Sequence, residues 1–442
     1  MLMRLLFVIA LLTPLPAAAQ DSGPVEVDVI GGQQAAQPVA VPQLAARGPA
    51  SGSAGTTDNL STNVSLVISD GLRRTGVITP IGPAGLRRLR PEEVTSPAWS
   101  DWRRSGAIAL VSGYVEYMAD GRLTVACYLY DSATGRELVR RGFAVAPNDW
   151  RRAATKCADA IYSRLSGEEP FLDTRVVYVA ETGGKGNRVK RIAIMDSDGE
   201  NHRYLTEGLE TVLTPRFSPT GRQLVYMSYK GRRPRSYVLD LDSGQSRLLV
   251  PGTAFTFAPS FSPDGRQIVF SMAEGGNTDI YVVGANGGTP RRLTTMPGVD
   301  TSPSFSPDGS KIVFESDRSG SQQLYVMDAN GANQKRISFG GGNYASPAWS
   351  PQGNRIAFTK IGGGQFRIGV MSPAGGGERL LTSAWQDEGP SWAPNGQFVM
   401  FHRTNRGSGE ASLYAVPVNG GRERVMPTPL GGSDPSWSPL QN

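Results

Sequence analysis

A twelve-residue stretch, Pro259-Ser-Phe-Ser-Pro-Asp-Gly-Arg-Gln-Ile-Val-Phe270, recurs in near copies through the C-terminal two thirds of the 442-residue chain. Each copy places an aromatic residue between two prolines, and successive aromatic residues are 44, 44, 44, 43 and 45 positions apart. These residues are Phe217, Phe261, Phe305, Trp349, Trp392 and Trp437. A period in the low forties is typical of β-propeller blades of four strands each, in the manner of WD40-like repeats.

Each repeat unit holds enough turn signals to separate four strands. In the unit that begins at Phe261, a Pro263-Asp264-Gly265 turn precedes an apolar run, and Asn286-Gly287 marks a later tight turn. Proline at the second and glycine at the fourth position favour a type I turn, and Asn-Gly favours a two-residue hairpin. We expect the aromatic residue of each unit to pack between neighbouring blades, where its burial contributes about 2–3 kcal/mol.

The repeats also predict how the ring closes. Six apolar strands of a second kind begin at residues 176–180, which have no proline-flanked aromatic residue in front of them. The sixth aromatic motif, Ser436-Trp437-Ser438, lies instead near residue 442. The two series match if this last strand completes the blade begun by residues 174–205, which leaves no exposed sheet edge. We therefore predict a mainly β fold, with a six-bladed propeller over residues 169–442 closed by a C-terminal strand.

A small α/β domain is predicted before the propeller, over residues 20–168. Three apolar segments are separated by turns that contain Asp-Gly and Thr-Gly, which favours an antiparallel meander. These segments are residues 108–117, 123–130 and 138–145. One helix is predicted from a cap at Asp58 or Ser61, because apolar residues recur behind it at helical spacing, and a second from Asn148-Asp149.

Two other segments of this domain have less regular patterns. Residues 48–55 are rich in glycine, serine and alanine, which predicts a flexible loop. Residues 25–30 alternate apolar and charged side chains, which is typical of an edge strand or of a free arm. The two cysteines, Cys127 and Cys157, fall on a predicted strand and a predicted helix. The pattern suits a disulfide and two buried thiols equally well.

The first nineteen residues have the layout of a secretory signal peptide. Arg4 precedes the apolar residues 5–12, and the small residues Ala17 and Ala19 suit a cleavage site. The apolar run is too short to span a bilayer. We therefore expect a mature chain that starts near Gln20 and is exported to the periplasm.

The composition argues against several functional classes. The formal net charge is +6, but arginine pairs such as Arg151-Arg152 lie among acidic residues, and no basic stripe with stacking aromatic residues stands out. The chain contains only two histidines and lacks the Gly-x-Ser-x-Gly, His-Glu-x-x-His and phosphate-loop motifs. We therefore predict no nucleic acid partner, no catalytic residues, no cofactor and no metal site. Asp300, Glu388 and Asp434 lie near the predicted channel, most simply as solvated loop residues.

The order of these parts resembles the TolB family, the periplasmic component of the Tol-Pal envelope system of Gram-negative bacteria. The resemblance rests on the signal peptide, the α/β domain and the six Pro-Ser-Phe-Ser-Pro-Asp-Gly units, and it spans the chain. It implies a non-enzymatic interaction protein, in which the repeats form scaffold and turns. The implied protein is a monomer that supports outer-membrane integrity and constriction of the envelope at cell division.

The resemblance also implies where two partners bind. The loops before each proline-flanked aromatic residue would receive Pal, the peptidoglycan-associated lipoprotein, and so hold the protein at the outer membrane. The matching positions are Thr214, Ala258, Thr301, Ser302, Ala345, Ser346, Glu388, Gly389 and Asp434. The N-terminal arm of the mature chain would bind TolA. Its residues are Gln20, Asp21, Val25, Glu26, Val27, Asp28, Val29 and Ile30.

Two alternative functions fit the repeats. The blade motif also resembles the propellers of prolyl oligopeptidases, but the residues before the propeller lack the nucleophile motif of an α/β-hydrolase. A propeller that binds a glycan or another small ligand in its channel is the second alternative. The resemblance to the TolB family also leaves room for other envelope proteins as further partners.

Overall fold

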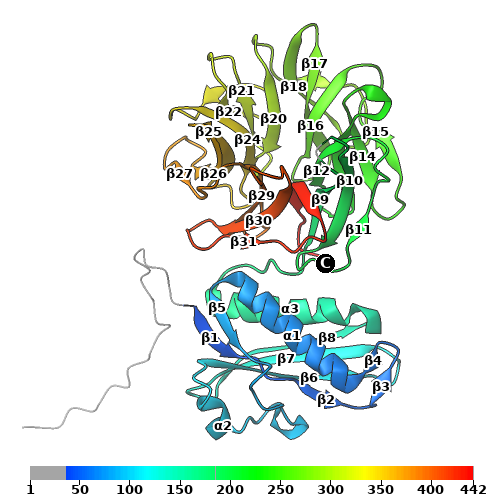
Figure 1. Cartoon of the computed structure of the whole chain (residues 1–442), viewed down its shortest axis with the longest axis vertical. Coiled ribbons are helices and arrows are strands. Elements are labelled where there is room, and N and C mark those ends of the chain that lie inside the picture. Colours follow the sequence, from blue (N-terminus) through cyan, green and yellow to red (C-terminus); the bar gives the residue numbers. More distant parts are fainter. Residues whose placement is uncertain (1–35, 185, 442) are drawn as a thin grey trace, which may run out of the picture. The chain divides into compact units, whose positions relative to one another are not determined.

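Six four-stranded antiparallel sheets follow one another around a ring in the computed structural model, which describes residues 36–184 and 186–441 (Figure 1). Blade 1 contains β9 (Arg175–Thr182), β10 (Val189–Asp196), β11 (Arg203–Tyr204) and β32 (Gly431–Trp437). Blade 2 contains β12 (Val212–Phe217), β13 (Gln223–Ser228), β14 (Arg235–Asp240) and β15 (Ser246–Leu248). Blade 3 contains β16 (Phe255–Phe261), β17 (Gln267–Glu274), β18 (Asn277–Gly284) and β19 (Arg291–Arg292).

The other three blades repeat this order. Blade 4 contains β20 (Asp300–Phe305), β21 (Lys311–Ser316), β22 (Gln323–Asp328) and β23 (Lys335–Arg336). Blade 5 contains β24 (Asn343–Trp349), β25 (Ile356–Gly362), β26 (Gln365–Met371) and β27 (Arg379–Leu380). Blade 6 contains β28 (Asp387–Trp392), β29 (Phe398–Thr404), β30 (Ala411–Pro417) and β31 (Arg424–Val425). The predicted six-bladed propeller is confirmed.

The ring closes through strands from opposite ends of the propeller. Strand β32 pairs antiparallel with β9, and Trp437 lies opposite Val176. Blade 1 therefore has the strand order β11-β10-β9-β32, as the offset between the two series of repeats predicted. Because β32 occupies the free edge of β9, the innermost strand of blade 1 comes from the C-terminal end of the ring.

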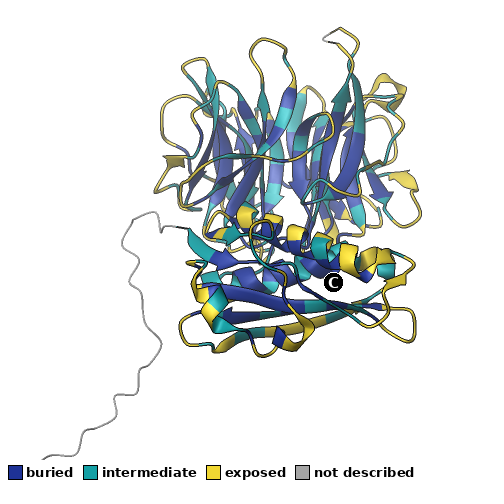
Figure 2. Ribbon diagram, turned by 60° about the horizontal axis from the view of Figure 1, so that its bottom comes forward, coloured by how far each residue is buried: buried dark blue, intermediate teal, exposed yellow. Residues whose placement is uncertain are grey.

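The repeated aromatic residues lie between blades, as predicted. Phe305 belongs to one apolar cluster with Val269 of blade 3 and Ile312 of blade 4. Trp392 joins Ala357 of blade 5 to residues of blade 6 in the same way. Figure 2 shows that burial is concentrated in the strands, whereas the loop ends are exposed. The aromatic residues thus hold neighbouring blades together and leave the loops free.

The residues before the propeller form a mixed sheet with the order β5-β1-β6-β7-β8, and β2 also pairs with β6. The antiparallel meander of β6, β7 and β8 is confirmed, and parallel β1, β2 and β5 extend it. The parallel strands were missed because they are short and two of them contain a proline. The strands are β1 (Gln37–Ala40), β2 (Ala45–Arg47), β5 (Ile78–Ile81), β6 (Ala109–Tyr117), β7 (Leu123–Asp131) and β8 (Glu137–Val145).

Two long helices, α1 (Thr57–Thr75) and α3 (Trp150–Ser166), pack their apolar faces against this sheet (Figure 1). The cap of α1 is Thr56, whose side chain accepts the N–H of Asn59, and neither Asp58 nor Ser61 as predicted. A short helix, α2 (Trp99–Arg103), contributes Trp102 to a second apolar cluster. Of the helices that the structure describes, none is both long and apolar enough to cross a membrane.

One local feature of this part decides between two sequence expectations, and another differs from what the sequence predicted. Cys127 on β7 and Cys157 on α3 form a disulfide, which ties the sheet to the helix. The segment predicted as a flexible loop contains a small hairpin of β3 (Ser51–Gly52) and β4 (Gly55–Thr56). The Tyr117 hydroxyl accepts the N–H of Ala54 and donates to the carbonyl of Gly55, which holds this hairpin in place. The predicted signal peptide and arm lie outside the described residues.

Candidate partner-binding edge of the propeller

The innermost strand of every blade has a β-bulge in its middle, at the residue pair that ends in the repeated proline. The register shifts lie between Leu213 and Arg216, Phe257 and Ser260, Thr301 and Ser304, Ala345 and Ala348, Glu388 and Ser391, and Ser433 and Ser436. A bulge leaves one residue out of the ladder and redirects its side chain. The repeat thus interrupts pairing at the same level in all six blades.

The residue that precedes the proline has a positive φ in each bulge. The φ values are 48° for Thr214, 43° for Ala258, 53° for Ser302, 50° for Ser346, 66° for Gly389 and 50° for Asp434. This conformation is unfavourable for a residue with a Cβ atom, and a following proline also disfavours helical backbone angles. Strained residues of this kind cluster at functional sites, so the bulges are the first candidates for function.

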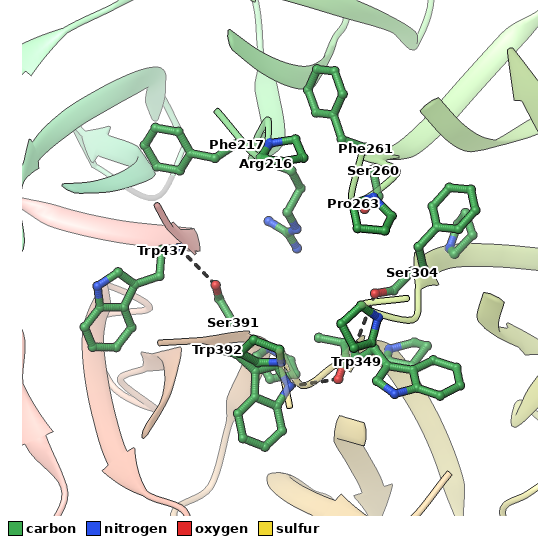
Figure 3. A pocket seen from close by; sticks show the side chains of 18 of the residues that line it. Arg216, Phe217, Ser260, Phe261, Pro263, Ser304, Trp349, Ser391, Trp392 and Trp437 are labelled. Atoms are coloured by element: carbon green, nitrogen blue, oxygen red, sulfur yellow. Dashed lines mark hydrogen bonds between the residues drawn. The ribbon is translucent and has the colours of Figure 1, made fainter. Parts of the chain in front are cut away.

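The bulges surround one cavity of about 440 Å³ in the channel of the propeller (Figure 3). Six of the predicted Pal-binding residues line it: Thr214, Ala258, Ser302, Ser346, Gly389 and Asp434. The other three, Thr301, Ala345 and Glu388, each stand one residue earlier and still pair with the next strand of their blade. The structure therefore brings all nine predicted residues to the bulges around a single channel.

Hydrogen bonds join the bulges of neighbouring blades. The Glu315 carboxylate accepts the Ser302 hydroxyl at 3.1 Å and the N–H of Ser346 at 2.7 Å. Burial raises the pKa of Glu315. On the other side of the ring, Asp434 Oδ2 accepts the N–H of Thr214 at 3.3 Å. Because these bonds cross from blade to blade, the channel edge is a rigid platform.

The acidic residues near the channel have different surroundings. Asp300 is fully buried and forms an ion pair with Arg318, which corrects the expectation of a solvated loop residue. Glu388 lies 3.9 Å from Nε2 of His402, and Nδ1 of His402 accepts the N–H of Asp434. Within residues 36–184 and 186–441, no three histidine, cysteine, aspartate or glutamate side chains are grouped as a metal ion would require.

A ring of exposed apolar side chains was not predicted from the sequence. The segments that connect the outermost strand of one blade to the innermost strand of the next, taken with the first residue of that strand, each expose one large apolar residue or more. We call the following six residues the apolar rim: Leu209 (80% exposed), Phe255 (42%), Met296 (52%), Phe339 (72%), Trp385 (37%) and Leu430 (45%). They stand 6–10 residues before each repeated aromatic residue, and this unequal spacing gives only a weak signal in the sequence.

The apolar rim lies where the chain enters the innermost strands, and the bulges lie further along the same strands. Each connecting segment leads into the first residues of the innermost strand. These residues pair with the last residues of the second strand, as Phe255 pairs with Ala273. The Pro263-Asp264-Gly265 turn and its counterparts join the same two strands at the opposite end. The apolar rim therefore leads along the innermost strands to the polar, cross-linked bulges, and the cavity that the bulges line extends from them towards the opposite turns.

Comparison with known proteins identifies the family. Residues 162–441 match the TolB beta propeller domain, and residues 25–138 match the TolB amino-terminal domain. The chain belongs to the TolB family. It is 61% identical over 414 residues to the Tol-Pal system protein TolB of Zymomonas mobilis, covering 94% of this chain and 90% of the relative.

Other TolB relatives match over a similar length. The Tol-Pal system protein TolB of Rhizorhabdus wittichii is 61% identical over 438 residues, which are 99% of this chain and 100% of the relative. The crystal structure of TolB from Acinetobacter baumannii superposes with a TM-score of 0.79 at 26% identity, covering 92% of this chain and 97% of that one. The resemblance to the TolB family and the predicted fold class are confirmed.

Proposed function

We propose that this chain is a non-enzymatic, periplasmic interaction protein of the Tol-Pal system, which binds Pal at the edge of the propeller that carries the bulges and the apolar rim. The observation that carries the proposal is the repetition, in all six blades, of an exposed apolar residue at the entry to an innermost strand that bears a bulge. Relatives of this chain in the TolB family are named as Tol-Pal system proteins.

The chemistry of this edge suits a protein partner. Exposed apolar patches of this kind mark interaction surfaces, and aromatic residues such as Phe255, Phe339 and Trp385 are frequent anchors of protein interfaces. The hydrogen-bonded bulges offer fixed polar groups inside the apolar ring, which favours specific docking over general adhesion. A partner that covers the rim buries apolar surface without reorganising the blades.

The second partner in this proposal is TolA, which binds the N-terminal arm at residues 20–30. The arm lies outside the described residues, so this part of the proposal rests on membership of the TolB family and on the alternating pattern of residues 25–30. Export by the signal peptide, cleaved near Ala19, places both partners within reach. The protein then acts as a monomer, attached to the outer membrane through Pal, in envelope integrity and cell division.

The two sites are coupled in this account. Pal on the propeller edge changes whether the arm is free for TolA, and by linkage TolA changes the affinity for Pal by the same factor. Coupling free energies between sites are commonly about 1–3 kcal/mol, so the change in affinity is about 5- to 150-fold.

Recovery of the full-length protein from envelope extract tests the proposed partners. The wild-type protein should bring down both Pal and TolA, whereas deletion of residues 20–32 should remove TolA and retain Pal. A blade variant with an intact arm, Thr289→Arg, is the matched control, because Thr289 is exposed on the turn between β18 and β19. Recovery of TolA in wild-type amounts by the deletion variant would contradict the role of the arm.

A further inference from the structure

One of the six equivalent channel positions differs in chemistry from the others. The residue after the repeated proline is Arg216 in blade 2, and its counterparts are small: Ser260, Ser304, Ala348, Ser391 and Ser436. Three of the serine hydroxyls accept an N–H from the next blade, as Ser391 does from Trp437 at 3.0 Å. Arg216 instead extends its guanidinium into the open centre of the ring (Figure 3).

The guanidinium of Arg216 has little to hold it in the described structure. One nitrogen, Nη1, donates to the carbonyl of Pro215 at 2.9 Å. No carboxylate of the described residues lies within salt-bridge distance, and the one other charged residue of the cavity, Asp434, accepts the N–H of Thr214. Burial lowers the pKa of Arg216, and Asp434 opposes this shift from a distance. A guanidinium has five N–H donors, so most of them point at space that a ligand could fill.

The surroundings of Arg216 supply a second observation that points to a ligand. The Thr214 hydroxyl, two residues away, is buried at the cavity and has no hydrogen-bond partner among the described residues. Unsatisfied buried polar groups are costly, and an enclosed charge without a partner is more costly still. The rest of the cavity wall consists of proline, serine, glycine, alanine and aromatic residues.

We propose that the propeller channel contains a carboxylate-binding site, in which Arg216 forms a two-pronged contact with the carboxylate and Thr214 donates its hydroxyl. One guanidinium balances one carboxylate, and its planar fork matches the two oxygens. The prolines that line the cavity suit a short apolar chain behind the carboxylate. Such a group has two sources: an acidic side chain or terminus of the protein that docks on the apolar rim, or a free small acid.

Calorimetric titration of the full-length protein with butyrate tests the site itself, with butyramide as the neutral probe and ionic strength held constant with chloride. Butyrate should saturate one site at a dissociation constant of about 1 mM or tighter, and butyramide should not. Arg216→Ser, which gives blade 2 the residue of other blades, should weaken butyrate roughly tenfold or more. Equal affinity in this variant, or no saturable binding to the wild-type protein, would overturn the proposal.

Two further variants separate a ligand contact from a structural role. Arg222→Ser removes an exposed arginine that pairs with Asp242 outside the cavity, and it should leave butyrate binding unchanged. Asp434→Asn removes the one negative charge of the cavity while keeping an oxygen that can accept the Thr214 N–H, so it should tighten butyrate binding. If Arg216 serves only to balance Asp434, the Asp434→Asn substitution will not tighten binding.

Titration with Pal distinguishes the two sources and keeps this inference separate from the proposed function. If the carboxylate belongs to the docked protein, Arg216→Ser weakens Pal and butyrate competes with Pal. If it belongs to a free acid, Arg216→Ser weakens butyrate alone. A wild-type protein that binds butyrate but not Pal would contradict the proposed function and still support the site.

Discussion

At the scale of single residues, the most distinctive positions of the propeller are those before the repeated prolines. Five of the six have a Cβ atom and a positive φ, and the sixth is Gly389. Their repetition in every blade shows that the ring accepts the cost of this backbone six times. We infer that this backbone serves to place the residues before the prolines along the channel, where they line the cavity.

Exchanging alanine and glycine between two bulges tests this strain. Ala258→Gly should raise the free energy of unfolding by about 0.5–1 kcal/mol, because relief of the left-handed backbone exceeds the entropy cost of glycine. Gly389→Ala should lower it by about 1–2 kcal/mol, since its new Cβ would also lie 3.3 Å from Nδ1 of His402. Urea unfolding measures both changes, and a loss of stability in both variants would show that the bulges are not strained.

A buried carboxylate in the α/β part gives a prediction for pH. Glu93 accepts two hydrogen bonds from the Arg87 guanidinium at 2.7 Å and two from Arg90, one from its guanidinium at 3.0 Å and one from its backbone N–H at 3.2 Å. These contacts, led by the one from Arg87, lower the pKa of Glu93 from 4.5 to about 2. Because the folded pKa is depressed, the stabilisation is complete above pH 4.5 and is lost as the pH falls towards 2.

Glu93→Gln should therefore destabilise the protein at neutral pH by about 1–2 kcal/mol, a figure reduced for the exposure of the two arginines. The difference from the wild-type protein should shrink as the pH falls below 4.5. Unfolding midpoints measured across the pH range check this, with Glu92→Gln as the control because Glu92 is exposed. A difference that stays constant down to pH 3 would rule out the ion pair as its cause.

At the scale of elements, β32 does more than complete a blade. Its Trp437 packs edge-on against Phe171, with ring centroids 6.1 Å apart, and its indole N–H donates to the Thr174 hydroxyl at 2.8 Å. Residues 171–173 in turn donate three backbone N–H groups to the Asp159 carboxylate on α3. The closing strand is thus connected to the segment that leads from α3 into the propeller.

Replacing two tryptophans compares how much the closing strand and the apolar rim each contribute to the free energy of unfolding. Trp437→Ala should lower the free energy of unfolding by about 3–5 kcal/mol, because it leaves a cavity at the closing strand. Trp385→Ala, at a residue that is 37% exposed, should cost less than about 1 kcal/mol. Chemical unfolding of both variants measures the difference, and equal losses would mean that the closing strand is not a special point of the ring.

The elements also show what the sequence could predict. The ring, its closure and the meander followed from period, turn residues and alternation, because each is a local pattern repeated or bounded by glycine and proline. The parallel strands β1 and β5 were missed, since pairing between distant short segments leaves no local pattern. The Thr56 cap was missed because Asp58 and Ser61 were equally suitable residue types nearby.

The residues of the candidate site also fall into those that the sequence predicted and those that it did not. The nine predicted positions could be assigned because the repeat fixes them in every blade; six of them line the cavity, and their role in binding stays a prediction. The apolar rim was missed because its residues vary in type and stand at unequal distances from the repeat. Arg216 was visible in the sequence as a departure from serine, but only the geometry of the ring shows that it faces an enclosed cavity.

At the scale of the whole molecule, residues 36–442 form one compact unit, and the arm belongs to the N-terminal residues outside it. This division suits the proposed roles. In the proposed function, the rigid ring would bind one partner at one edge and a separate segment would bind the other. The domain boundaries predicted at residues 19 and 168 remain predictions.

The most direct measurement of the central claim is calorimetric titration of Pal against three forms of the protein. The wild-type protein should bind one Pal, and Ala258→Arg should bind it at least roughly tenfold more weakly, because a long charged side chain would stand in the channel mouth. Thr289→Arg adds the same charge at the opposite edge of the same blade and should bind as the wild-type protein does. Equal affinity for all three forms would contradict docking at the edge that carries the bulges.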